Sequence, residues 1–261
     1  MNTKLNPKKI TFPNNFECYY VGSKEETEYI FKEVFIEQQY LQNGIVIREG
    51  DCIFDVGANI GMFSLFVNQL QEKVKIYAFE PIEKIFDVLN ENVRLHYLEK
   101  NVFLFNYGLS SENNHEQIFT FYPQMTGNST SKPGEKLVNI DAVFDKVSND
   151  VEDLFTDFFK DVEQVKCQVR TLSSVIKELG INSIDLLKID VEGEEYEVFK
   201  GIESSDWAKI KQIVAEVHDR QGKLDRIKEM LTFYGFSQIK AEKINFLPSK
   251  FVDTYNLYAV R

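Results

Sequence analysis

Short apolar runs alternate with amphipathic segments along the chain from residue 51 onward. Five apolar runs predict strands over 52–56, 74–79, 102–106, 184–190 and 213–217. The first four runs are nearly continuous, which is typical of parallel strands covered on both faces. Apolar positions at helical spacing predict helices over 60–71, 83–98, 193–200 and 222–234. The alternation predicts an α/β fold with a mostly parallel sheet and helices on both of its faces.

The two ends of the chain extend this pattern. The stretch 1–50 is predicted to form an N-terminal extension, with an extended segment at 16–21 and a helix over 24–42 that ends at Gly44. Residues 51–261 form the main domain. At the end of this domain, segments 236–241 and 255–260 predict an antiparallel hairpin on one edge of the sheet.

The connection between the third and fourth predicted strands is far longer than the few residues usual for such loops. It forms an insertion over about 109–170 and must contain structure of its own. Residues 117–122 predict a strand, and apolar residues at helical spacing predict an acidic amphipathic helix over 151–162. We interpret this helix as packed on the core. A mobile lid over the substrate and a dimer contact are the alternatives.

Composition and charge narrow the functional classes. The chain has 261 residues, of which 43% are hydrophobic, and can bury a full core. Its net charge of -11 disfavours nonspecific binding to nucleic acid or to an anionic membrane, because either would repel it. Three widely spaced cysteines without a CxxC pair predict neither a disulfide framework nor a zinc site. With no apolar run of membrane-spanning length and a polar start, we expect a cytoplasmic protein.

The sharpest motif is a glycine-containing turn, Asp55-Val-Gly57-Ala-Asn59-Ile-Gly61, between the first strand of the main domain and the helix that follows. Glycines there let the backbone approach a ligand and expose amides at the helix N-terminus. Glu80 ends the next strand, where an acid accepts hydrogen bonds from ribose hydroxyls. Together these features predict a nucleoside-cofactor site at a topological switch point of the sheet. A purely structural turn is the alternative.

The same turn favours S-adenosylmethionine over a dinucleotide. A dinucleotide needs glycine where this sequence has Asn59, and the carboxylate of Asp55 would repel a pyrophosphate. S-adenosylmethionine has no phosphate and carries an ammonium group that Asp55 can hold. We therefore assign the run from Asp55 to Gly61 to the methionine end of the cofactor and Glu80 to its ribose end.

Several motifs in this order resemble the FkbM family of O-methyltransferases. They are FDVGANIGMFSL from Phe54, FEP from Phe79, KIDVEGEE from Lys188 and EVH from Glu216, and the similarity covers about residues 50–217. The resemblance implies a Rossmann-like class I methyltransferase with a seven-stranded sheet, S-adenosylmethionine as methyl donor and usually a hydroxyl acceptor. The five cofactor residues named above fall on matching positions.

The resemblance also points to the segment after the third strand. Asn106 and Gly108 occupy the region that usually meets the adenine of the cofactor. This sequence has no acid there to accept the adenine amino group.

Acidic residues and a histidine end the fourth and fifth predicted strands. Strand C-termini face the ligand crevice in open α/β sheets, so we expect Asp190, Glu216 and His218 at the site, with Asp190 also near the cofactor. Methyl transfer to a hydroxyl needs an acceptor held in line and a base for its proton. His218 is the best base candidate, oriented by Asp190 or Glu216. A histidine held by a structural hydrogen bond is the alternative.

Other acids beside these strand ends have simpler interpretations. We interpret Glu195 as complementing the N-terminus of the helix that follows it. No ligand cage is evident, so we assign no metal ligands. A divalent cation such as Mg²⁺ remains an alternative, because acids at neighbouring strand ends resemble the layout by which some methyltransferases hold one.

The leading hypothesis is an enzyme that methylates a hydroxyl of a natural product or sugar. Its partner would be a small-molecule acceptor, free or presented by a biosynthetic synthase. One alternative is a nicotinamide-dependent oxidoreductase, which Asn59 argues against. A second alternative is a noncatalytic scaffold that binds a nucleoside.

Overall fold

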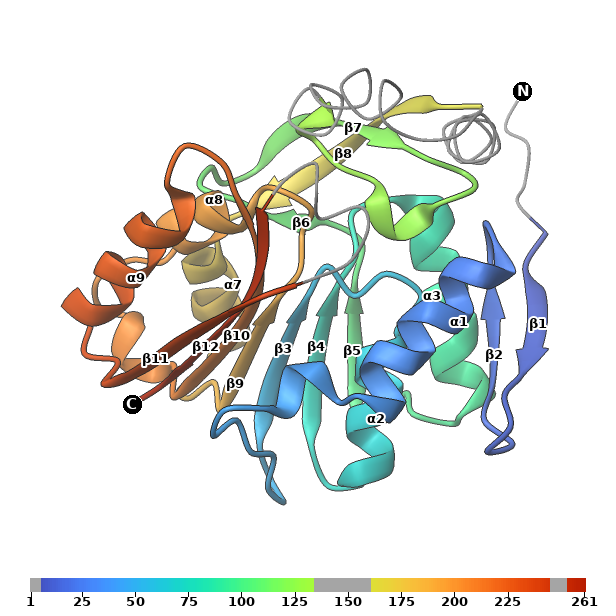
Figure 1. Ribbon diagram of the computed structural model, residues 1–261, viewed down its shortest axis with the longest axis horizontal. Coiled ribbons are helices and arrows are strands. Elements are labelled where there is room, and N and C mark those ends of the chain that lie inside the picture. The colour runs from blue at the N-terminus through green and yellow to red at the C-terminus, as the bar shows by residue number, and fades with distance from the viewer. Residues whose placement is uncertain (1–5, 134–160, 245–252) are drawn as a thin grey trace.

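The computed structural model describes residues 6–133, 161–244 and 253–261. A sheet of seven strands lies at the centre of this described part (Figure 1): β3 (Cys52–Val56), β4 (Lys75–Phe79), β5 (Val102–Phe105), β9 (Leu186–Ile189), β10 (Gln212–Asp219), β11 (Gln238–Lys243) and β12 (Asp253–Val260). The strand order is β11-β12-β10-β9-β3-β4-β5, and only β12 runs antiparallel to its neighbours. The predicted mostly parallel sheet with an antiparallel hairpin on one edge is confirmed.

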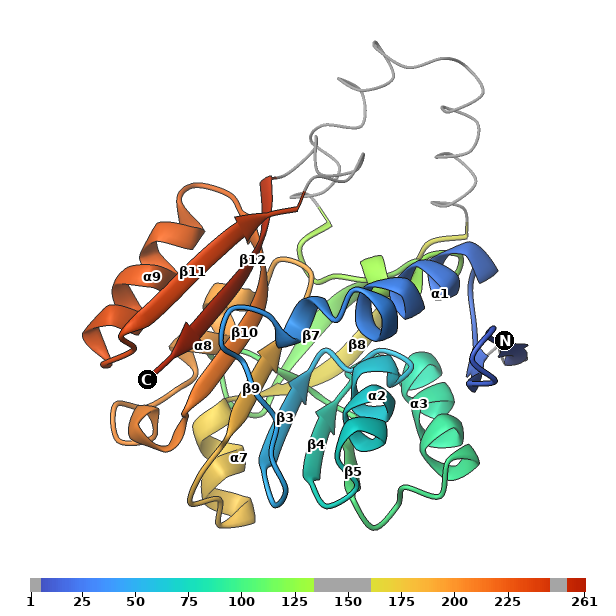
Figure 2. The ribbon, with the colours of Figure 1, turned by 60° about the horizontal axis from the view of Figure 1, so that its bottom comes forward.

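Helices cover both faces of this sheet (Figures 1 and 2). One face packs against α1 (Lys24–Phe31), α2 (Met62–Leu70) and α3 (Glu83–Leu95), and the other packs against α7 (Leu172–Leu179), α8 (Glu195–Lys200) and α9 (Lys223–Phe233). Successive side chains of a strand point to opposite faces of the sheet, so the hydrophobic core consists of two clusters, one on each face. In β3, for example, Ile53 belongs to the cluster under α2, whereas Phe54 belongs to the cluster under α7.

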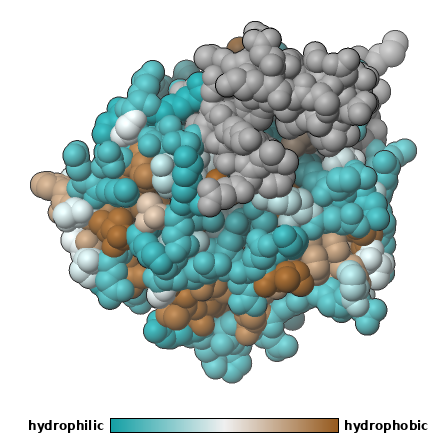
Figure 3. Space-filling model, viewed as in Figure 1, coloured by the Kyte–Doolittle hydropathy of each residue, from teal (hydrophilic) through white to brown (hydrophobic). Residues whose placement is uncertain are grey.

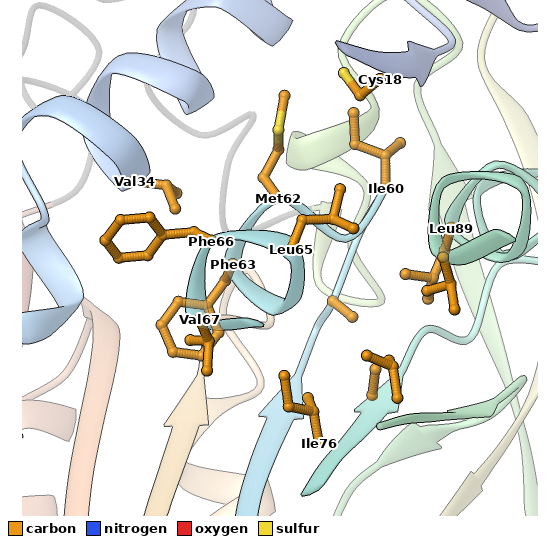
Figure 4. Packing of buried hydrophobic residues seen from close by; sticks show 14 of the residues in the cluster. Cys18, Val34, Ile60, Met62, Phe63, Leu65, Phe66, Val67, Ile76 and Leu89 are labelled. Carbon is orange, nitrogen blue, oxygen red and sulfur yellow. The ribbon is translucent and has the colours of Figure 1, made fainter. Parts of the chain in front are cut away.

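The N-terminal segment is part of this core. Figure 4 shows Val34 beside Phe66 of α2, while Leu89 of α3 lies on the other side of that helix. β1 (Lys8–Thr11) and β2 (Glu17–Tyr20) form an antiparallel pair, and β2 is held to α3 by Asn92, whose amide bonds the backbone of Tyr19. The boundary predicted at residue 50 therefore does not separate two hydrophobic cores.

The predicted continuous helix over 24–42 is wrong. α1 ends at Phe31 and continues as a π-helix, η1 (Lys32–Ile36). The chain then turns at Gln38, whose φ is 49°, and a 3₁₀-helix, η2 (Gln39–Leu41), follows. The break lets Tyr40 point back into the core with only 6% of its surface exposed, which a straight helix would not do.

The insertion forms a second, three-stranded sheet in the order β6-β8-β7. Its strands are β6 (Gly108–Leu109), β7 (His115–Phe121) and β8 (Glu163–Arg170), and a short 3₁₀-helix, η3 (Thr126–Asn128), follows β7. β7 confirms the strand predicted over 117–122, whereas the sequence analysis predicted neither β8 nor α7. The helix predicted over 151–162 lies outside the described residues, except for its last two positions.

The surface seen in Figure 3 is predominantly hydrophilic, with apolar residues in separate small patches. Within the three described ranges, no helix is both long enough and apolar enough to cross a bilayer.

Candidate functional site

The predicted site residues gather where the strand order of the main sheet reverses. From β3 the chain adds β4 and β5 on one side, and later β9 and β10 on the other. Ligands of open α/β sheets bind outside the carboxyl ends of the strands at such a switch point. Asp55 of β3 and Lys188 of β9 are direct partners in the register across it.

Alternation brings the polar side chains to one face. Lys188 and Asp190 share the face of Leu186, and Glu216 and His218 share the face of Val214, in the cluster under α1 to α3. Because Lys188 is paired with Val214, the carboxyl ends of β9 and β10 lie side by side. The N-terminal segment covers this face, so residues far apart in the sequence complete one site.

A buried ion pair lies at the centre of this site. The Nζ atom of Lys188 is 3.1 Å from Oδ1 of Asp55 and also donates to the carbonyl of Gly57 at 2.8 Å. The other carboxylate oxygen of Asp55 accepts a 2.7 Å hydrogen bond from Ser64. Burial lowers the pKa of Lys188, but the charges of Asp55 and Asp190 outweigh it and raise the pKa above its usual value. Asp55 thus has partners inside the protein, and a direct contact to a cofactor ammonium stays a prediction.

Two glycines of the turn are required by close packing. At Gly57, where φ is +76°, a Cβ atom would lie 1.8 Å from the carbonyl oxygen of Asp190. At Gly61, where φ is +93°, it would lie 2.6 Å from a methyl group of Leu89. Only glycine meets both conditions, so the turn can pass against the end of β9 and then begin α2 on top of α3.

The glycine turn after β3 and Glu80, which follows β4, are joined by a hydrogen bond. The carboxylate of Glu80 accepts hydrogen bonds from the backbone N–H groups of Asn59, at 3.1 Å, and Ile82, at 2.9 Å. Burial raises the pKa of Glu80 to about 7, although these two hydrogen bonds lower it. A carboxylate can accept further hydrogen bonds, so Glu80 retains capacity for a ribose hydroxyl. The amide of Asn59 faces η3, and its Oδ1 lies 3.5 Å from the hydroxyl of Thr126.

Asn106 and Gly108 lie on the β5 side of this turn. The amide of Asn106 donates to the carbonyls of Glu80, at 3.0 Å, and Pro81, at 3.2 Å. Gly108 begins β6, and a Cβ atom there would meet Val169 and Pro81 at ordinary contact distances. Asn106 thus lies against the residue assigned to the ribose, while the predicted contact of Asn106 and Gly108 with adenine stays a prediction.

His218 is surrounded by carboxylates. Its Nδ1 atom lies 3.1 Å from Oε1 of Glu195, and its Nε2 atom lies 3.3 Å from Glu192 and 3.9 Å from Glu216. Burial lowers the pKa of His218, but the charges of Glu192 and Glu195 outweigh it and raise the pKa to about 9. These carboxylates therefore favour the imidazolium form, in which both ring nitrogens hold protons, and the role of His218 as a general base stays a prediction.

Of the two residues predicted to orient His218, Glu216 lies 3.9 Å from its Nε2 atom, whereas Asp190 has other partners. Oδ2 of Asp190 accepts a 2.8 Å hydrogen bond from the hydroxyl of Tyr40 and lies 3.7 Å from Lys188. The group that holds the imidazole is Glu195, which is fully buried and also accepts from the N–H of Gly193. Glu195, which the sequence analysis interpreted only as complementing the N-terminus of α8, thus also contacts His218. The sequence analysis missed this contact.

The N-terminal helix adds more acids to this face. Glu33 accepts a 2.5 Å hydrogen bond from Tyr29, and burial raises its pKa to about 7, with further increases from Asp190 and Glu192. Glu216 is affected similarly, because burial first and then the charge of Asp190 raise its pKa well above the usual value. The carboxyl ends of β9 and β10 are thus surrounded by carboxyl groups that raise one another's pKa.

Several of these residues carried no usable signal in the sequence. Tyr40 lies 150 positions before Asp190 and Glu33 lies further still, and the sequence analysis assigned both only to a helix of the N-terminal extension. Lys188 was different, because a lysine inside an apolar strand must find a buried acid. The sequence analysis did not use that signal; in the structure the acid is Asp55, the one acid inside the neighbouring strand β3.

The sequence of this chain is similar to those of known methyltransferases. The family model described as the methyltransferase FkbM domain matches residues 55–237. The 31-O-demethyl-FK506 methyltransferase FkbM of Streptomyces tacrolimicus is 35% identical over 88% of this chain and 89% of its own length. The methyltransferase sdnD of Sordaria araneosa is 33% identical over 89% of this chain and 90% of its own.

A third relative is much larger. The AMB antimetabolite synthetase AmbE of Pseudomonas aeruginosa is 34% identical over 90% of this chain, which corresponds to 12% of the synthetase. The match to the family model and the two relatives of similar length show that the chain belongs to the FkbM methyltransferase domain family and is a methyltransferase.

Proposed function

We propose that the chain transfers a methyl group from S-adenosylmethionine to a hydroxyl group of a small natural product. The observation that carries this proposal is the hydrogen bond from the N–H of Asn59 to Glu80, which joins the glycine turn and the acid after β4 at the switch point. It supports the proposal because an acid that can accept from a ribose then lies beside a turn that suits a cofactor without phosphates.

The methionine end of the cofactor would lie along Gly57, toward the carboxyl ends of β3 and β9. The donor methyl group would then face Asp190 and the ends of β9 and β10. The acidic groups of Glu33, Asp190 and Glu216 suit a positively charged sulfonium, because a positive charge beside them favours their ionised form. An acceptor hydroxyl would approach from the side of Glu216 and His218.

The names of the relatives support the acceptor class. One relative is described as a 31-O-demethyl methyltransferase, and another is a synthetase that contains a similar segment. We therefore propose an alcohol as acceptor, either free or attached to a biosynthetic synthase.

Calorimetric titration with S-adenosylhomocysteine and with NAD⁺ tests the cofactor. We expect S-adenosylhomocysteine to bind and NAD⁺ not to bind. Transfer of labelled methyl from S-adenosylmethionine to panels of alcohols, amines and thiols tests the acceptor, with product identified by mass spectrometry. Binding of NAD⁺ alone, or transfer confined to amines or thiols, would contradict the proposal.

A further inference from the structure

Three possible metal ligands converge beside the cofactor site. They are carboxylate oxygens of Glu192 and Glu216 and a ring nitrogen of His218, and all three atoms lie within 4.8 Å of one another. Each comes from a different position in the backbone: Glu192 from the loop after β9, Glu216 from within β10, and His218 two residues later on the same face. The sequence analysis assigned no metal ligands, because it found no ligand cage, and kept a divalent cation as an alternative.

The distances suit one small cation. The Nε2 atom of His218 lies 3.3 Å from Oε2 of Glu192 and 3.9 Å from Oε1 of Glu216. A divalent ion with bonds of about 2.0–2.2 Å holds neighbouring ligand atoms roughly 3–4 Å apart. Mixed imidazole and carboxylate donors favour a first-row divalent ion such as Mn²⁺ over Ca²⁺, which prefers oxygen ligands alone.

A second observation comes from the other side of the imidazole ring. Glu195 is fully buried, and its Oε1 atom contacts Nδ1 of His218, while its Oε2 atom has no hydrogen-bond partner among the described residues. Histidines that bind metals usually donate their other N–H to such a carboxylate, which fixes the tautomer and turns the free nitrogen toward the metal. Here that nitrogen is Nε2, which faces Glu192 and Glu216 and would bind the cation in place of its proton.

The loop that carries Glu192 is held in place from outside. The hydroxyl of Thr130 donates a 2.6 Å hydrogen bond to the carbonyl of Glu192, whose φ of 55° lies in the left-handed region. The side chain of Glu192 is therefore directed to the strand ends by a fixed backbone. Asp190 and Glu33 add negative charge nearby, which a cation would offset.

We propose that Glu192, Glu216 and His218 bind one divalent cation of the Mn²⁺ class, with Glu195 as the residue that positions His218. The binding site does not depend on the identity of the cofactor. Its use in catalysis, which would be to hold the acceptor oxygen and make its proton more acidic, rests on the proposed function.

Electron paramagnetic resonance with Mn²⁺ on the full chain tests the site. We expect one Mn²⁺ per chain, displaced by other divalent ions, and a nitrogen modulation in the spin echo from one imidazole. Glu216→Gln and His218→Asn should each weaken Mn²⁺ binding by at least about 10-fold, and Glu195→Gln should weaken it by about 10-fold. His115→Ala is the matched control, since this exposed histidine also lies near an acid, with Nδ1 at 3.5 Å from Glu112.

Two results would overturn the site: no Mn²⁺ bound beyond that of an unrelated acidic protein, or bound Mn²⁺ without nitrogen modulation. The second measurement uses only the unaltered protein, so it decides the question even if a variant fails to fold. Titration with S-adenosylhomocysteine separates this outcome from the proposed function. Cofactor binding without Mn²⁺ binding refutes the metal site alone, whereas Mn²⁺ binding without cofactor binding refutes the proposed function alone.

Discussion

The ammonium group of Lys188 and the carboxylate of Asp55 form an ion pair at the switch point of the sheet, with 4% and 0% of their side chains exposed. Lys188 also donates a hydrogen bond to the carbonyl of Gly57, so this one side chain connects β9 to the glycine turn that follows β3. A buried ion pair contributes little net stability, because the desolvation of both charges offsets their attraction. The loss of one partner is far more costly, because it leaves the other charge buried and unpaired.

Lys188→Met should therefore lower the free energy of unfolding by about 3–5 kcal/mol. Urea denaturation followed by circular dichroism measures this change. The double variant Asp55→Asn with Lys188→Met should recover most of the loss, because it removes both charges. Equal destabilisation in the single and double variants would show that packing, and not charge, determines the effect.

Gly57→Ala should destabilise the protein far more than Gly50→Ala. Both glycines have positive φ, +76° and +85°, so both substitutions carry the left-handed backbone penalty of about 1–2 kcal/mol. Only at Gly57 would the new Cβ meet a backbone oxygen at 1.8 Å, whereas nothing lies within 4 Å at Gly50. Thermal unfolding of the two variants compares them directly, and similar melting temperatures would contradict the close approach to Asp190.

Glu80 should make stability depend on pH. Burial raises its pKa to about 7 from the model-peptide value of 4.5, so the folded protein holds this proton more tightly than the unfolded chain. The free energy of unfolding should then fall as pH rises from about 4.5 to 7. Glu80→Gln should reduce this slope, by at most about 1.4 kcal/mol per pH unit. Glu229→Gln, on the exposed side of α9, should leave the slope unchanged.

The same residue should control cofactor affinity. If Glu80 accepts ribose hydroxyls as a carboxylate, S-adenosylhomocysteine should bind more tightly as pH rises through about 7. Glu80→Ala should weaken binding by about 1.5–3 kcal/mol, the size of a hydrogen bond to a charged group. Calorimetry across this pH range measures both effects, and an affinity that is independent of pH would remove Glu80 from the ribose site.

Replacement of residues 135–159 by a flexible linker should affect the acceptor more than the cofactor. The chain entering this segment is attached to the loop after β9, where Thr130 bonds Glu192 and the hydroxyl of Ser131 donates to Glu194 at 2.6 Å. We expect unchanged affinity for S-adenosylhomocysteine and a higher KM for the acceptor, or lost turnover. Loss of folding together with cofactor binding would contradict this expectation and support the interpretation of the predicted helix as packed on the core.

Much of the architecture followed from the sequence. Short continuous apolar runs such as 52–56 are typical of strands covered on both faces, and the structure contains a strand there. The glycine turn and Glu80 at the next strand end predicted where the ligand crevice lies. These features are local, because each depends on residues within one strand, helix or turn. Gly57 shows where such local prediction ends. The sequence analysis expected a glycine there for close approach to a ligand, but only the structure showed that the carbonyl of Asp190 leaves no room for a side chain.

Only the tertiary structure decided the partners of the ionisable groups. His218 contacts Glu195 and Glu192, and Asp190 contacts Tyr40 from a segment 150 residues away. Side chains at strand ends can reach several neighbours at similar distances, so alternation determines the face of a residue but not its partner. The choice depends on how the N-terminal segment breaks at Gln38 and how the loop at Glu192 is held, which are long-range contacts without a periodic pattern in the sequence.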